Sequence, residues 1–206
     1  MPTVDLLQRP VDPSSGARER IMEAVYDLFS RRGIRAVGID AIISQSGVAR
    51  MTLYRHFGSK EELVLAYLER REEVWTHSWL QADVERLASD PRERLLAIFD
   101  VFHNWFQRPD FEGCAFMNVM LETADDGTDD AVYRASSAYL ANVRGFVERL
   151  SSEAGIPDPA SFGRQWHLLM KGSIVAAGEG DRDAARHGRA IGRLVLADAL
   201  AAAPAL

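Results

Sequence analysis

The sequence is poor in cysteine and in long apolar runs, and both shortages exclude classes of protein. Its single cysteine, Cys114, excludes an internal disulfide framework and favours a reducing compartment. No stretch approaches the roughly 18 uncharged apolar residues of a membrane helix. The first residues also lack the basic lead-in of a signal peptide. We therefore expect a cytoplasmic protein without a membrane partner.

Motifs of catalysis and of metal binding are missing as well. The five histidines show no ligand spacing with acids or with the cysteine. The sequence has no nucleophile elbow and no phosphate-binding loop. We therefore expect neither an enzyme nor a resident metal or cofactor.

Strand-type alternation is absent too, whereas apolar residues recur at helical spacing through most of the chain. The predicted fold class is all-α. Residues 1–14, which are rich in proline and lack apolar periodicity, are expected to form a disordered arm. Glycine, proline and aspartate breakers then predict helices at about 14–32, 39–46, 50–57, 60–82, 91–107, 114–123, 129–154, 158–178 and 181–202.

The net charge of −6 is unevenly distributed along the chain. Residues 1–60 carry nine Arg and Lys against six Asp and Glu, hence +3, and the remainder carries −9. A chain that is basic over its first 60 residues and acidic over the remainder could bind the phosphate backbone of DNA through its basic part. A difference of this size also arises by chance, so charge alone decides nothing.

A helix-turn-helix is predicted between about Ile39 and Phe57. Two short helical segments are joined at Gly47, where the tight turn demands a positive φ. Leu53 and Phe57 are four residues apart and would anchor the second segment in a small core. Its other side chains form a polar face suited to the major groove of DNA.

The same residues resemble the tetracycline-repressor (TetR) family of bacterial regulators, over residues 17 to about 68. The matching parts are Phe29 to Gly33, Ile42 to Val48, and Thr52 to Leu63, which reads Thr-Leu-Tyr-Arg-His-Phe-Gly-Ser-Lys-Glu-Glu-Leu. The resemblance implies phosphate contacts and base-edge contacts from a set of DNA-binding residues: Arg50, Met51, Thr52, Tyr54, Arg55, His56 and Lys60. Gly38 and Ala49 depart from the pattern, because the family often has a hydroxyl residue that caps a helix at each position.

The resemblance also implies a domain division. A helix-turn-helix DNA-binding domain of three helices spans residues 15–60, and a helical effector-binding and dimerisation domain spans residues 61–206. In this view the last two long helices pair with a second subunit, through Phe162, Trp166, Leu169, Ile174, Ala185, Gly188, Ile191, Gly192, Val195 and Ala199. Packing within one chain is the alternative explanation of this face.

A small hydrophobic or aromatic ligand is expected among the middle helices. The candidate pocket residues are Phe99, Phe102, His103, Trp105, Phe106, Cys114, Asn118, Glu122, Trp166 and His167. Aromatic residues at helical spacing more often belong to a core than to a pocket. Whether Cys114 senses oxidants is left open.

The predicted function is that of a TetR-like regulator. It would bind palindromic operator DNA as a homodimer, repress transcription and be released by the ligand. The alternatives are an all-α protein-interaction module and a TetR-like activator.

Overall fold

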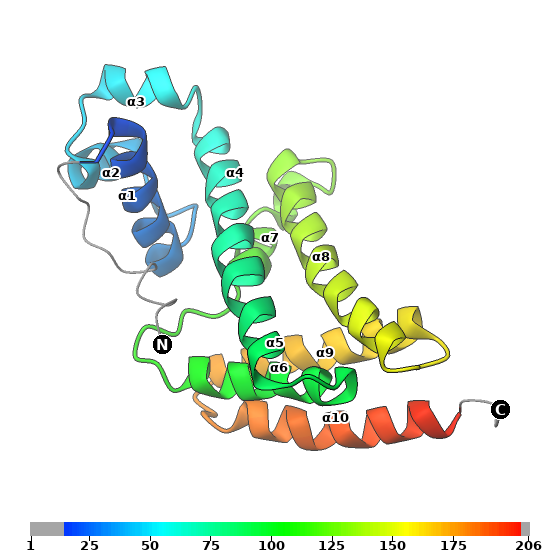
Figure 1. Ribbon diagram of the computed structural model, residues 1–206. Coiled ribbons are helices and arrows are strands. Elements are labelled where there is room, and N and C mark those ends of the chain that lie inside the picture. Colours follow the sequence, from blue (N-terminus) through cyan, green and yellow to red (C-terminus); the bar gives the residue numbers. More distant parts are fainter. Residues whose placement is uncertain (1–14, 203–206) are drawn as a thin grey trace. The chain divides into compact units, whose positions relative to one another are not determined.

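The computed structural model describes residues 15–202, so the arm expected at residues 1–14 lies outside the described residues. All regular elements in the described range are helices, which confirms the all-α prediction (Figure 1). In chain order they are α1 (Ala17–Arg32), α2 (Ile39–Ser46), α3 (Arg50–His56), α4 (Lys60–Arg71), the π-helical η2 (Glu72–Gln81), α5 (Ala82–Leu87), α6 (Pro91–Phe106), α7 (Ala115–Glu122), the short 3-10 turn η3 (Ala124–Asp126), α8 (Ala131–Glu153), α9 (Pro159–Gly178) and α10 (Ala184–Ala201).

The helix predicted from residue 60 to about residue 82 is not uniform. α-Helical turns end at Arg71, and η2 follows with π-helical turns before α5 begins. A π-helix has hydrogen bonds from i to i+5, and long runs of it are rare. The helical pattern of the sequence was therefore interpreted correctly, but the change in helix type was not predicted.

The chain forms two compact units. Over the described residues, the N-terminal unit comprises residues 15–75 and 115–139, and the C-terminal unit comprises residues 76–114 and 140–202. The expected division after residue 60 differs from this one. The reason is that α4 belongs to the core of the N-terminal unit: Tyr67 packs edge-on against Tyr26 and Phe29 of α1, with ring centroids 5.5 and 5.6 Å apart.

The N-terminal unit is built around the apolar face of α1. Ile21, Val25 and Phe29 are buried there, and the short helices α2 and α3 add Ile42 and Leu53 to the same core. Helices of seven or eight residues are unstable alone, so this packing holds them in place.

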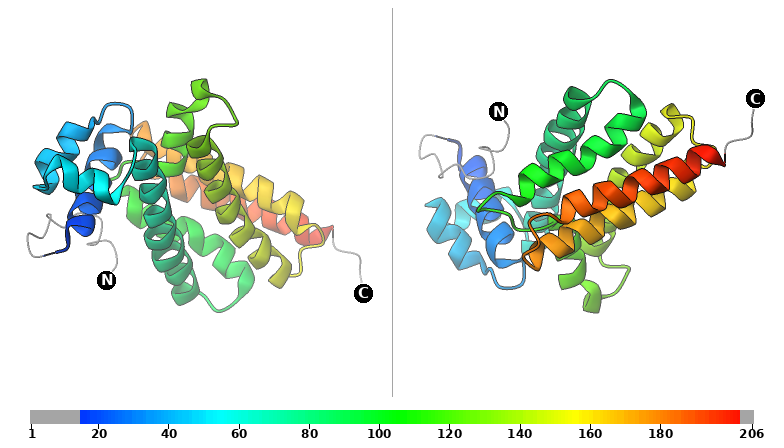
Figure 2. Two further views of the ribbon diagram at one scale, coloured as in Figure 1. Left: turned by 90° about the horizontal axis from the view of Figure 1, so that it is seen from above. Right: turned by 90° about the horizontal axis from the view of Figure 1, so that it is seen from below.

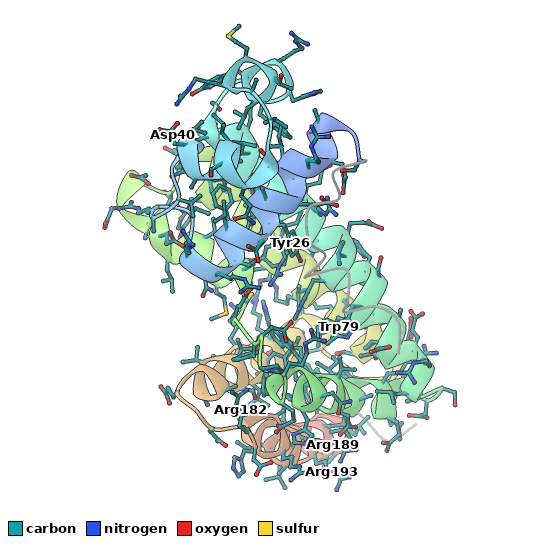
Figure 3. All side chains as sticks on the ribbon, turned by 90° about the vertical axis from the view of Figure 1, so that its left-hand side faces the viewer. Tyr26, Asp40, Trp79, Arg182, Arg189 and Arg193 are labelled. Carbon is teal, nitrogen blue, oxygen red and sulfur yellow. The ribbon has the colours of Figure 1, made fainter. Side chains whose placement is uncertain are left out.

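A buried arginine joins α4 to α1 in the same unit. Arg71 donates from Nη1 to the Tyr26 hydroxyl at 2.8 Å, and its guanidinium lies 5.1 Å from the centre of the Tyr26 ring (Tyr26 is labelled in Figure 3). Burial raises the pKa of Tyr26 to about 12, although Arg71 opposes the shift. Tyr26 therefore remains a neutral hydroxyl at physiological pH.

The C-terminal unit has α6, α9 and α10 at its centre, and α9 and α10 lie side by side (Figure 2). Two glycines of α10 allow the close approach. A Cβ on Gly192 would lie 2.9 Å from the Trp166 ring, and one on Gly188 would lie 2.8 Å from Phe99 and closer still to the Ser173 hydroxyl. Small residues on α10 thus admit aromatic side chains of the same chain.

The described residues offer neither a membrane span nor a cluster of metal ligands. None of their helices is both long and apolar enough to cross a membrane. Within residues 15–202, no three or more His, Cys, Asp or Glu side chains gather as metal ligands would.

Candidate nucleic-acid interface

The turn between α2 and α3 has the predicted geometry. Gly47 adopts φ 65° and ψ 20°, in the left-handed region, and its N–H donates to the Ile43 carbonyl at 3.0 Å. A residue with a Cβ would be strained in this conformation, so glycine sets the angle at which α3 leaves α2.

Helix α3 has one buried side and one exposed side. Leu53 is fully buried and Phe57, just after the helix, is 4% exposed. On the other side Met51 is 76% exposed and Tyr54 is 42% exposed. Arg50, Arg55 and His56 are exposed as well, and Thr52 is half-buried. The polar face expected from the sequence is therefore open to solvent, held by two apolar anchors.

Arg50 is held by an acid that sequence reasoning did not single out. Asp40, in the first turn of α2, forms an ion pair from its Oδ1 with the Arg50 Nη2 (Asp40 is labelled in Figure 3). Both side chains are largely exposed, at 57% for Arg50 and 82% for Asp40. The signal available in the sequence was an acid at a helix start ten residues before the arginine.

The start of α4 places Lys60 beside α3. Ser59 caps the helix by accepting from the Glu62 N–H at 3.1 Å, and the Glu62 carboxylate accepts from the Gly58 N–H at 2.7 Å. Lys60 is half-buried; burial lowers its pKa, and the nearby Glu122 carboxylate opposes that shift. Lys60 thus lies partly buried at the start of α4, four residues after the end of α3.

Glu122 contacts the turn after α1. Its Oε2 accepts from the Arg35 N–H at 2.8 Å, and the Arg35 side chain pairs with Asp126 at 3.1 Å. A Cβ on Gly33 would lie 2.7 Å from the other Glu122 oxygen. Glu122 therefore joins α7 to the turn between α1 and α2.

The other proposed pocket residues are divided between the two units. Asn118, like Glu122, belongs to the N-terminal unit, whereas the remaining eight lie in the C-terminal unit. Phe99, Phe102, Trp105 and Phe106 are almost fully buried against one another, with ring centroids of neighbouring pairs 5.6 to 6.4 Å apart. These aromatics form core, as the alternative interpretation held.

Cys114 is buried, which does not favour access by oxidants. His103 is half-buried at the end of α6. His167 is 4% exposed; burial lowers its pKa to about 3, and Lys171 and Arg144 add to the shift. His167 is therefore a neutral core residue at physiological pH.

The residues proposed for the dimer face are mostly covered within one chain. Six of the ten are buried: Phe162, Trp166, Ile174, Ala185, Gly188 and Gly192. Leu169, Val195 and Ala199 are half-buried, and Ile191 is exposed. Contacts within the chain therefore cover most of this face. Both α9 and α10 also carry apolar residues on more than one side.

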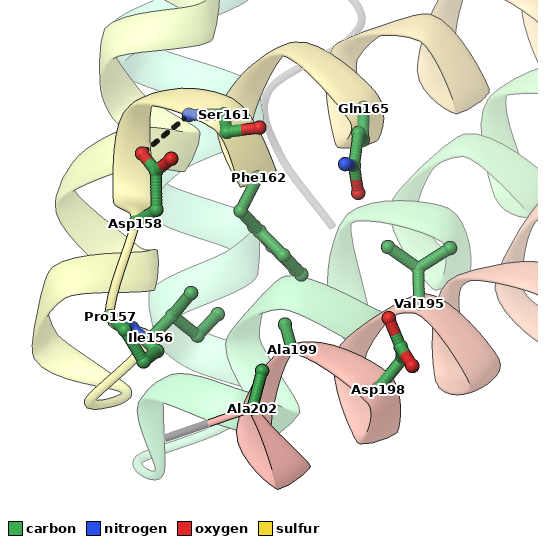
Figure 4. Close-up of a pocket in the computed structure, with 10 residues that line it drawn as sticks. All are labelled: Ile156, Pro157, Asp158, Ser161, Phe162, Gln165, Val195, Asp198, Ala199 and Ala202. Carbon is green, nitrogen blue, oxygen red and sulfur yellow. Dashed lines mark hydrogen bonds between the residues drawn. The ribbon is translucent and has the colours of Figure 1, made fainter. Parts of the chain in front are cut away.

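A groove lies beside α9 and α10 (Figure 4). It has a volume of about 160 Å³ and is lined by both apolar and polar side chains: Ile156, Pro157, Asp158, Ser161, Phe162, Gln165, Val195, Asp198, Ala199 and Ala202. Three residues proposed for the dimer face, Phe162, Val195 and Ala199, line this groove. None of the proposed ligand-pocket residues does.

Two short helices joined by a glycine turn, with an exposed polar face on the second, define an all-helical protein of the helix-turn-helix DNA-binding class. The sequence pattern of the bacterial regulatory proteins of the tetR family matches residues 21–67. The helix-turn-helix domain of the chain is therefore a DNA-binding domain of the TetR type.

Known proteins resemble the chain in sequence and in fold. The transcriptional activator FasR of Mycolicibacterium smegmatis is 35% identical over 95 residues, covering 46% of this chain and 42% of FasR. The transcriptional repressor Rv3405c of Mycobacterium tuberculosis is 39% identical over 80 residues, covering 37% of this chain and 43% of the repressor. The match thus spans less than half of either relative.

One solved structure matches nearly the whole chain. SCO4454, a TetR-family transcriptional regulator from Streptomyces coelicolor, superposes with a TM-score of 0.82 at 29% identity. The match covers 90% of each chain. The likeness therefore extends over the C-terminal helices as well as the helix-turn-helix.

Proposed function

We propose that the protein is a cytoplasmic transcriptional repressor that binds palindromic operator DNA as a homodimer and is released by a small hydrophobic or aromatic ligand. The observation that carries this proposal is the exposed face of α3, which presents Arg50, Tyr54 and Arg55 while Leu53 fixes the helix from behind. A helix so held can enter the major groove without rearranging the core.

The proposed contacts divide by the group that they reach on DNA. Tyr54, His56 and Lys60 bind phosphates, whereas Arg50, Met51, Thr52 and Arg55 lie near base edges or flanking phosphates. Phosphate contacts set affinity for any duplex, and base contacts set preference among sequences.

The experiment that tests DNA binding starts with duplexes selected by the protein from a pool of genomic fragments. We expect Tyr54→Phe and Lys60→Ala each to weaken binding to the selected duplex and to random duplex, by about 1 kcal/mol. Arg86→Ala is the matched control, because it removes an exposed cation from α5 in the C-terminal unit, outside α9 and α10. A selection that enriches no sequence, or binding indifferent to the α3 variants, would contradict the proposal and favour a protein-interaction module.

For the homodimer we propose a different set of residues from the buried one. Leu168 and Leu194 are 71% and 72% exposed, and Val175 and Ile191 are half exposed, on the paired helices α9 and α10. Large apolar side chains gathered on two neighbouring helices are typical of an interface. A twofold axis there would present two α3 helices to successive major grooves, roughly 34–36 Å apart.

Sedimentation velocity tests the dimer surface. Leu194→Glu should convert a dimer into a monomer, since a charge in an apolar interface is left unpaired. Leu87→Glu is the control, because Leu87 is exposed on α5 and lies outside the pair. Equal sedimentation of both variants and the parent would remove this surface from the proposal.

Activation is the second candidate, and it is favoured by one comparison. FasR is named an activator, whereas Rv3405c is named a repressor. Transcription in vitro from a promoter next to the selected site separates the two outcomes. Addition of aromatic compounds that raise the melting temperature then tests release by a ligand.

A further inference from the structure

The ion pair between Asp40 and Arg50 lies on the surface of the N-terminal unit. Its two partners belong to different helices, and both are largely exposed. An exposed pair contributes little to folding, because water screens the attraction and two flexible side chains lose freedom. A carboxylate on a DNA-binding face is also repelled by phosphates. An acid in the first turn of α2 stabilises the helix slightly, through its attraction to the helix dipole, but this role does not require an arginine of α3 as its partner.

The pair leaves most of the arginine available. Asp40 accepts from Nη2, and among the described residues it is the one partner that the structure gives to the Arg50 side chain. A guanidinium has five N–H donors in a planar fork. Nε and Nη1 therefore keep donors that can point away from Asp40, and the plane of the fork is restrained by the bond at Nη2.

A restrained arginine suits one base more than the others. In the major groove guanine presents two acceptors, O6 and N7, that match a pair of guanidinium donors. A free arginine side chain must lose rotational freedom to make this pair, whereas one held by a neighbour has lost part of it already.

We propose that Asp40 is a positioning residue for base recognition, holding Arg50 so that its remaining donors meet O6 and N7 of one guanine in each operator half-site. This inference rests on the proposed function, since it assumes that α3 enters the major groove. It adds the kind of base that Arg50 reads and gives a role to an acid on α2. Asp40 itself makes no contact with DNA in this arrangement.

The experiment uses the full-length protein and the duplex enriched by selection from a random-sequence pool. Each guanine of the half-site is replaced in turn by 7-deazaguanine, which lacks the N7 acceptor, and then by adenine. For the parent protein we expect one guanine at which adenine weakens binding by about 5- to 150-fold. Arg50→Ala should lose this dependence at that guanine and keep it elsewhere.

Asp40→Ala carries the decisive measurement. We expect the preference for that guanine to fall at least fivefold, while affinity for random duplex stays equal or rises because a negative charge has been removed. Asp40→Asn, which keeps an acceptor oxygen, should restore part of the preference. Asp27→Ala is the control: it removes an acid of the same unit that pairs with Arg31, and it should leave the preference unchanged. Circular dichroism melting checks that the variants remain folded.

The outcomes separate the inference from the function on which it rests. If Asp40→Ala raises affinity for selected and random duplex by the same factor, the acid merely repels DNA and the inference is wrong, while sequence-specific binding stands. A half-site in which no guanine depends on Arg50 overturns the inference in the same way. If the parent protein enriches no sequence, both the inference and the proposed function fail.

Discussion

Substitution of Gly33 measures how firmly α7 is joined to the turn after α1. Gly33 has φ 77° and ψ 165°, a backbone region that is essentially limited to glycine. An alanine here costs on the order of 1–3 kcal/mol in backbone strain. Its Cβ would also lie 2.7 Å from Oε1 and 2.9 Å from Oε2 of Glu122, so this carboxylate must move.

Moving the carboxylate breaks a second interaction. Glu122 accepts from the Arg35 N–H at 2.8 Å, and loss of such a bond at an exposed site costs about 1 kcal/mol. We therefore expect Gly33→Ala to lower the free energy of unfolding by about 2–4 kcal/mol. Urea unfolding followed by circular dichroism measures this change.

Gly127 provides a matched control for the strain. It has φ 96° and ψ 160°, in the same backbone region, and nothing lies within 4 Å of a Cβ built there. Gly127→Ala should therefore cost the strain alone. In a Glu122→Ala background, Gly33→Ala should cost about the same as Gly127→Ala, with a coupling energy of about 1 kcal/mol in the double-mutant cycle. A coupling energy of zero would refute the placement of Glu122 against this turn.

Three further predictions concern single positions. Ala49 lies just before α3 and provides no side-chain cap. Ala49→Ser should therefore add about 1 kcal/mol to the free energy of unfolding and raise the melting temperature by about 2–4 °C. Ser59→Ala removes an existing cap and should lower the melting temperature. The pKa of His167 is about 3 when folded and about 6.5 when unfolded, so the unfolded chain binds the extra proton between these values and stability falls as the pH drops. From pH 7 to about pH 5 the free energy of unfolding should fall by about 2 kcal/mol from this cause. Urea unfolding at several pH values should show that His167→Leu removes this part of the pH dependence. An unchanged dependence of the unfolding free energy on pH in the variant would contradict the prediction. Met51 is 76% exposed, so Met51→Ala should leave the melting temperature unchanged. If Met51 packs on a thymine methyl, replacing one thymine of the selected duplex by uracil should weaken DNA binding by the parent protein and not by the variant. Equal effects on the binding of both proteins would exclude that contact.

Local rules were sufficient to predict the helix-turn-helix. Gly47 has the positive φ that the turn requires, and Leu53 and Phe57 are the buried anchors that their spacing predicted. The cap of α4 is also a local contact, because Ser59 accepts from the N–H of Glu62, three residues further on. Each of these features depends on residues within a few positions of one another, which is why the sequence reveals them.

The faces of α9 and α10 could not be assigned in the same way. Periodicity separates an apolar stripe from a polar one, but both helices carry apolar residues on two sides. The small residues Gly188 and Gly192 fit a close approach to a partner subunit as well as to the chain itself. Within the chain, Phe99 and Trp166 occupy the space that the glycines leave.

Charge shows most clearly what a linear division of the sequence misses. Residues 1–60 are basic, but the N-terminal unit also contains the rest of α4 and residues 115–139, which bring in Glu122, Asp126 and other acids. Over its described residues this unit has 11 Arg and Lys against 14 Asp and Glu, hence a net charge of −3. Attraction to a phosphate backbone at this unit therefore cannot come from net charge. It has to come from the few cations placed on and beside α3, because exposed charges more than about 10 Å apart are largely screened at ordinary salt.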